Sequence, residues 1–236
     1  GELLIRLAVP TVAAQMINML YNIVDRIYIG HISGNGSLAL TGVGVCMPLI
    51  MIISAFAALV GNGGAPRASI LMGKGDKAKA EKILGNCFTT QLIISVILTV
   101  VMYFFNRPML LAFGASTNTI DYAVSYMNIY AIGTLFVQLT LGMNTFITAQ
   151  GFAKTGMLSV LIGAVVNIVL DPVFIFALNM GAAGAALATI ISQACSCVWV
   201  LSFLFGKKTT LRIKKENLVA TANGTLTISP VLAKSA

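Results

Sequence analysis

Two carboxylates, Asp25 and Asp171, lie well inside apolar stretches of the sequence. Placing a charged side chain inside a membrane helix costs on the order of several kcal/mol, so such residues usually serve an ion pathway. Burial favours the neutral, protonated form of a carboxylate, and two neighbouring carboxylates repel each other. A pair in one chamber would therefore hold either protons or a cation, which is the chemistry of ion exchange.

Polar residues accompany the first carboxylate at helical spacing. Gln15, Asn18, Asn22 and Asp25 are separated by three, four and three residues, which places them on one face of a helix. We expect this face to point into the bundle or a water-filled cavity, because lipid cannot satisfy it. Hydrogen bonding between helices is the alternative explanation.

The second carboxylate has the same kind of neighbourhood. Asn167 and Asp171 share a helical face, and Pro172 follows at once. Proline removes the backbone hydrogen bond to residue 168, so we expect a kink or hinge beside these side chains. A purely structural hydrogen-bonding role for Asp171 is the alternative.

The elements that must position these residues are long apolar runs. A bilayer core about 30 Å thick needs about 20 helical residues. Six stretches are long enough, at about 3–29, 40–65, 83–105, 120–149, 156–178 and 183–205. The sequence therefore predicts an all-α integral membrane protein, a six-transmembrane-helix bundle. At 1.5 Å per residue, Asp25 lies about 30 Å along the first helix and Asp171 about 22 Å along the fifth, so both fall in the outer half of the membrane.

Composition agrees with lipid as the surrounding solvent. The chain has 236 residues, of which 58% are hydrophobic and 9% charged, and its mean hydropathy is +0.92. A soluble domain carries about a quarter charged residues. The net charge of +8 comes from basic clusters between apolar runs, which indicates membrane topology and anionic lipid and no nucleic-acid partner.

The basic clusters predict the orientation, because loops rich in Lys and Arg stay in the cytoplasm. They occupy alternate connections, at 74–82, at Lys154 and at 207–215. Both termini are therefore expected in the cytoplasm. We divide the chain into a transmembrane lobe at 1–206, a basic cytoplasmic connector at 207–219 and a disordered tail at 220–236.

Other chemistry has little support in the sequence. The cysteines Cys46, Cys87, Cys195 and Cys197 form no C-x-x-C pair, and His31 is the one histidine. No nucleophile–base pair or metal cluster is visible. We expect no enzyme activity, no cofactor and no metal beyond a possible sodium ion at the coupling site.

Three segments resemble the MepA-like bacterial branch of the MATE (multidrug and toxic compound extrusion) transporters. They are Asn22–Gly30 (NIVDRIYIG), Gly61–Ser69 (GNGGAPRAS) with GKGD at 73–76, and Asn167–Phe176 (NIVLDPVFIF). The resemblance covers roughly residues 2–218. Transporters of this family have twelve helices in two six-helix lobes around a cavity of alternating access, and proton or sodium entry drives export of organic cations or drugs.

The resemblance implies that this chain is an N-terminal lobe that lacks its C-terminal lobe. It implies a site for the coupling ion at Asp25, Asn167 and Asp171, with Tyr126, Asn144 and Thr189 as further lining residues and with a hinge at Pro10. The helical spacing described above adds Asn18 and Asn22 as lining residues, and the missing proline hydrogen bond adds Pro172 as a hinge. The alternatives are a truncated, non-transporting membrane fragment, a half-transporter that needs a partner lobe, or a small channel.

Cysteine labelling in intact cells tests the orientation. A cysteine introduced at Asn35 should react with a membrane-impermeant reagent, whereas one introduced at Lys77 should react only after permeabilisation. The reverse pattern would refute the predicted topology. A variant without the native cysteines supplies the background.

Overall fold

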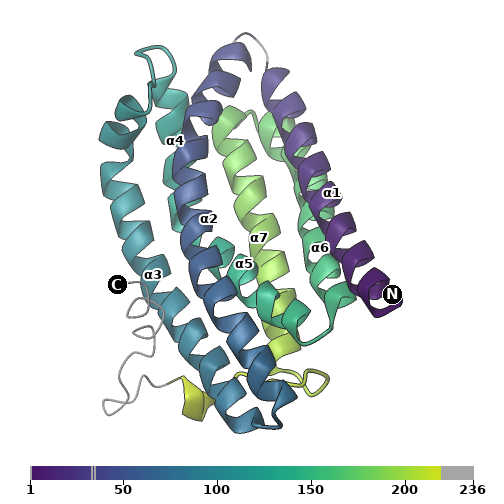
Figure 1. The fold of residues 1–236 in the computed structure, drawn as a ribbon. Coiled ribbons are helices and arrows are strands. Elements are labelled where there is room, and N and C mark those ends of the chain that lie inside the picture. The colour runs from purple at the N-terminus through teal and green to yellow at the C-terminus, as the bar shows by residue number, and fades with distance from the viewer. Residues whose placement is uncertain (1, 33, 35, 219–236) are drawn as a thin grey trace.

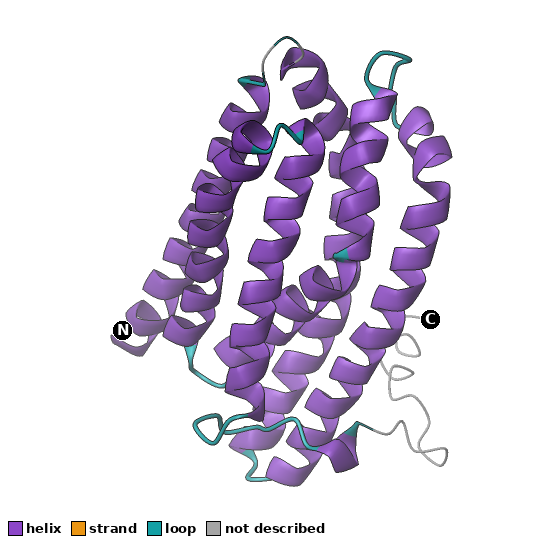
Figure 2. Ribbon diagram, turned by 180° about the vertical axis from the view of Figure 1, so that it is seen from behind, coloured by secondary structure: helices purple, strands orange, loops and turns teal. Residues whose placement is uncertain are grey.

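The computed structural model describes residues 2–32, 34 and 36–218, and these form helices joined by short loops (Figures 1 and 2). The expected tail at 220–236 lies outside the described residues. The helices are α1 (Glu2–Gly30), α2 (Gly36–Gly73), α3 (Lys77–Ala112), α4 (Ile120–Ile132), α5 (Thr134–Ala149), α6 (Ala153–Pro172) with the π-helical turn η1 (Val173–Ala177), α7 (Gly181–Phe205) and the short η2 (Lys215–Asn217).

Short loops make neighbouring helices antiparallel. Between α2 and α3, Gly75 adopts a φ of +79°, which favours glycine, and Asp76 caps α3 by accepting a hydrogen bond from the Lys79 amide at 3.2 Å.

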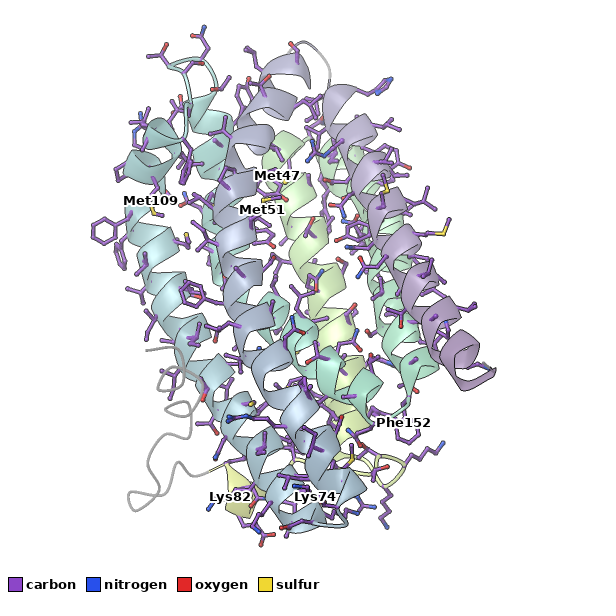
Figure 3. The ribbon with its side chains drawn as sticks, viewed as in Figure 1. Met47, Met51, Lys74, Lys82, Met109 and Phe152 are labelled. Atoms are coloured by element: carbon purple, nitrogen blue, oxygen red, sulfur yellow. The ribbon has the colours of Figure 1, made fainter. Side chains whose placement is uncertain are left out.

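Lys74 and Lys82 lie at the same end of the bundle as the segment after α7 (Figure 3). The basic clusters therefore gather at one end, which we call the basic end.

Apolar length supports most of the predicted spans. Within the described residues, four helices are long and apolar enough to cross a membrane: α2, α3, α6 with η1, and α7. The pair α4 and α5 makes a fifth if it is counted as one span. The 29-residue α1, which carries the polar face, is not among them and lies alongside α6 (Figure 1).

The expectation of one continuous helix over 120–149 was wrong. The chain bends by 59° between α4 and α5, at Gly133. A Cβ atom at this position would collide with the side chain of Ile190 on α7. The missing side chain thus allows the bend to lie directly against α7.

Two hydrophobic clusters fill the bundle. One includes Ile29, Met102 and Met127, and the other, near the basic end, includes Phe146 and Leu204. Large apolar side chains such as Met19, Phe104 and Val198 are exposed around the outside. This distribution suits a protein surrounded by lipid, where exposed apolar side chains carry no penalty.

The contact at Gly133 leads to a test of stability. We expect Gly133→Ala to lower the free energy of unfolding by about 1–3 kcal/mol, because the added methyl overpacks the contact with Ile190. The melting temperature of the purified protein measures the effect. Gly63→Ala is the matched control, since a Cβ at Gly63 meets nothing within 4 Å. Trimming Ile190 to alanine in the Gly133→Ala variant should restore part of the loss, and an unchanged melting temperature for Gly133→Ala would contradict the steric explanation.

Candidate functional site

The interface between α1 and α6 brings the two membrane carboxylates together. Asp25 lies near the end of α1 and is 8% exposed, whereas Asp171 lies near the end of α6 and is fully buried. Their carboxyl groups lie close enough to interact electrostatically. Residues 146 positions apart therefore share one site.

Helices α6 and α7 add a polar chain beside the carboxylates. Asn167, one turn before Asp171, donates from Nδ2 to Asp171 Oδ1 at 3.2 Å and to Thr189 Oγ1 at 3.5 Å. The Thr189 hydroxyl in turn donates to the Ala185 carbonyl at 2.9 Å. Helix α4 contributes Tyr126, which lies beside Thr189 and within range of the Asp25 charge.

Several oxygens in this site lack a partner. Asp25 Oδ1, Asn167 Oδ1 and Asp171 Oδ2 are buried and accept no hydrogen bond within the described part of the chain. No ion pair among the described residues involves either carboxylate, and the neighbouring Arg26 is exposed. Buried polar groups without partners are costly, so buried free oxygens on neighbouring side chains are suited to hold a proton or a hard cation.

The polar face of α1 enters the bundle only at one end. Asp25 is buried and Asn22 is half-buried, with its Nδ2 donating to the Asn18 carbonyl at 2.6 Å. Gln15 and Asn18, however, are exposed on this chain. The face therefore enters this bundle at Asp25 and partly at Asn22. For Gln15 and Asn18, the expectation that the face points into a water-filled cavity stays a prediction.

Asn144 lies away from the carboxylates. Its Nδ2 donates to the Gly156 carbonyl at 3.3 Å, near the opposite end of α6. Gly156 precedes Asp171 by fifteen residues, which is about 22 Å along a helix. The sequence could not reveal this separation, because Asn144 belongs to α5 beyond the bend at Gly133.

The two prolines differ in what surrounds them. Pro10 is buried within α1, which continues as a helix through it. Pro172 ends α6, and the π-helical turn η1 follows, in which the Leu178 amide donates to the Val173 carbonyl at 2.9 Å. The expected disturbance at Pro172 thus takes the form of a change of helical pitch beside Asp171.

Tyr21 is a site residue that the sequence analysis missed. It is half-buried on α1, beside Asn22, and within range of the charges of both Asp25 and Asp171. Its position four residues before Asp25, on the same helical face, was the available signal. On α4, the ring of Tyr126 stacks on the ring of Tyr130, with ring centroids 6.0 Å apart, so a second aromatic side chain lies behind Tyr126.

The sequence of this chain matches a known protein family. The MatE family profile matches residues 10–173, a range that contains Asp25, Asn167 and Asp171. This chain belongs to the MatE family. A multidrug export protein, MepA of Staphylococcus haemolyticus, is 28% identical over 204 residues, which cover 86% of the MatE chain and 45% of MepA. An FAD transporter of Shewanella oneidensis is 24% identical over 196 residues, covering 81% and 43%.

The fold agrees with solved structures of the family. One, described as the outward-facing conformation of a multidrug resistance MATE family transporter, superimposes with a TM-score of 0.85 at 27% identity. The match covers 93% of the MatE chain and 48% of that structure. The chain therefore spans about half the length of the relatives it matches, and it is a multi-pass membrane protein of the MatE family.

Proposed function

We propose that this chain is the N-terminal lobe of an antiporter that exports small organic cations or drugs across the cell membrane in exchange for H⁺ or Na⁺. The observation that carries the proposal is the buried pair Asp25 and Asp171, neither of which forms an ion pair among the described residues. The multidrug export activity named for the relatives supports the same substrate class.

The coupling ion binds where the free oxygens converge. Asn167 holds one oxygen of Asp171 by a hydrogen bond, and the other oxygen stays available beside Asp25. With both carboxylates charged, their repulsion in a low dielectric favours uptake of protons or of one cation. Binding and release of that ion would alternate with binding of the exported cation.

A second lobe completes the transporter. Gln15 and Asn18 expose polar groups on the surface of this chain, and such groups are costly when they face lipid. A second six-helix lobe packed against α1 would instead enclose them in a central cavity. The half-length match to the relatives supports this arrangement. The basic end faces the cytoplasm, together with both ends of this chain.

The lobe on its own should not transport. We expect proteoliposomes that contain this chain alone to show no ion-driven efflux of a cationic dye, because the exposed polar face leaves the pathway open to lipid on one side. Reconstitution with a matching second lobe should be required. Efflux by the purified chain alone, above that of empty liposomes, would disprove the requirement for a partner lobe.

Neutralising either carboxylate should uncouple transport. In the two-lobed protein, Asp25→Asn and Asp171→Asn keep the shape of the side chain but lose titration. Moving one charge through 100 mV corresponds to about 2.3 kcal/mol, so losing one coupled ion should reduce the attainable substrate gradient more than tenfold. Ion-driven efflux, normalised to folded protein, measures this.

Asp121→Asn is the matched control for these variants, because the Asp121 side chain is 82% exposed. It should leave the gradient unchanged. If Asp25→Asn and Asp171→Asn lower only the yield or the melting temperature, with wild-type coupling per folded molecule, the carboxylates are structural and the proposed site is wrong.

A further inference from the structure

The segment that follows α7 folds back across the basic end of the bundle. In Figure 1 it runs from the end of α7 to the flank of α3, where η2 lies. Leu211 and Ile213 are buried, at 0% and 4% exposure, and the Ile213 amide donates to the Leu204 carbonyl at 3.1 Å. Residues 207–218, which we call the strap, are therefore packed against the bundle despite their basic composition.

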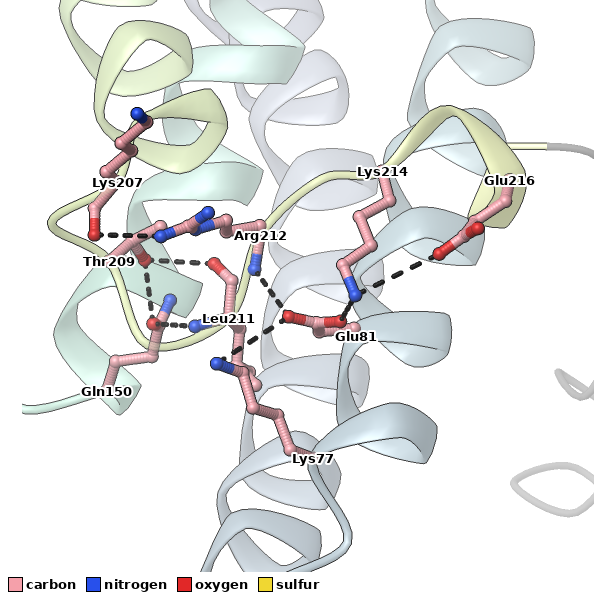
Figure 4. A network of polar contacts seen from close by, with 9 residues as sticks. All are labelled: Lys77, Glu81, Gln150, Lys207, Thr209, Leu211, Arg212, Lys214 and Glu216. Carbon is pink, nitrogen blue, oxygen red and sulfur yellow. Dashed lines mark hydrogen bonds and ion pairs between the residues drawn. The ribbon is translucent and has the colours of Figure 1, made fainter.

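Glu81 on α3 is the ionic centre of this contact (Figure 4). It is only 3% exposed, and its two oxygens meet Lys214 Nζ at 2.6 Å, Lys77 Nζ at 4.0 Å and the Arg212 amide at 3.4 Å. A buried carboxylate is stable only when it is paired and hydrogen-bonded, so Glu81 requires the strap. Its carboxylate raises the pKa of Lys214 above the ordinary value, as expected for a lysine that has gained an anionic partner.

Gln150, just after α5, holds the strap at a second point. Its Oε1 accepts two hydrogen bonds from the strap, from Thr209 Oγ1 at 2.8 Å and from the Leu211 amide at 2.7 Å. Its Nε2 donates to the Phe146 carbonyl at 3.1 Å, which fixes the orientation of the amide. One side chain thus satisfies a buried backbone donor of the strap and joins it to α5.

The far end of the strap is held against α3. Thr89 Oγ1 donates to the Leu218 carbonyl at 2.8 Å. Asn217 lies so close to Gly85 that a Cβ there would collide with it. The strap therefore contacts α7, the end of α5 and α3 in turn. Its last residue, Leu218, is held beside α3.

We propose that Glu81 and Gln150 are positioning residues that fasten the strap to this lobe, so that the strap moves with the lobe as one body and sets where the chain toward the second lobe begins. The role of the strap in a two-lobed protein rests on the function proposed above. The fastening itself does not. If the strap were released, its twelve residues could span about 40 Å when fully extended. The position at which the chain leaves the lobe would then no longer be fixed.

Hydrogen exchange of the strap tests the fastening without any transport assay. In detergent or nanodiscs, Glu81→Gln and Gln150→Ala should each raise the exchange rate of the amides of Leu211 and Ile213 at least tenfold, while the amides of central α3 stay unchanged. Asp76→Asn is the control, because Asp76 pairs with Lys79 at the same end of the bundle but does not touch the strap.

Efflux by the two-lobed protein tests the positioning role. The maximal rate should fall severalfold in Glu81→Gln, with the concentration of substrate at half-maximal rate unchanged. Unchanged exchange rates in both Glu81→Gln and Gln150→Ala would overturn the fastening. Increased exchange with wild-type efflux would overturn the positioning role, and absence of efflux in the unmodified protein would refute the proposed function while leaving the exchange result to decide the fastening.

Discussion

The packing of α1 against α6 is the contact on which the candidate site depends. It places Asp25 beside Asp171, although the two residues lie on different helices and are 146 positions apart in the sequence. Helices α4 and α7 then close around the pair with Tyr126 and Thr189. If α1 were displaced, each carboxylate would lose the neighbour whose charge makes an ion or a proton necessary.

Close contact between helices in this bundle relies on glycines and buried amides. Gln91 and Gln138, both fully buried, donate to the carbonyls of Ala57 and Ile53 on α2 at 3.1 and 2.7 Å. Gly142 on α5 leaves room for the Gln91 side chain, since a Cβ there would collide with it. Such contacts replace the hydrophobic driving force that lipid removes, because apolar side chains gain little by leaving one hydrocarbon environment for another.

Helical spacing was sufficient to predict most of the polar neighbourhood. The spacing of Asn167 and Asp171 is local, and their hydrogen bond at 3.2 Å follows from it directly. The bend at Gly133 was not predictable in this way, because it depends on Ile190 in a distant helix and both flanks are apolar. The packing of the strap was not predictable for a related reason. Its lysines and Arg212 predicted a basic cytoplasmic connector, and local composition gave no sign that Leu211 and Ile213 would be buried by long-range contacts with the bundle.

The π-helical turn after Pro172 gives the backbone beside Asp171 an adjustable pitch. Proline cannot donate to the Ile168 carbonyl, and in η1 the amide of Leu178 reaches back five residues where an α-helix reaches four. If an amide at this turn exchanged one carbonyl acceptor for the adjacent one, residues 173–177 would rotate by a fraction of a turn relative to α6. The long body of α6 below it keeps its register. Such a local exchange of partners would re-aim the side chains of η1 above the site, while Asp171 stays with the body of α6.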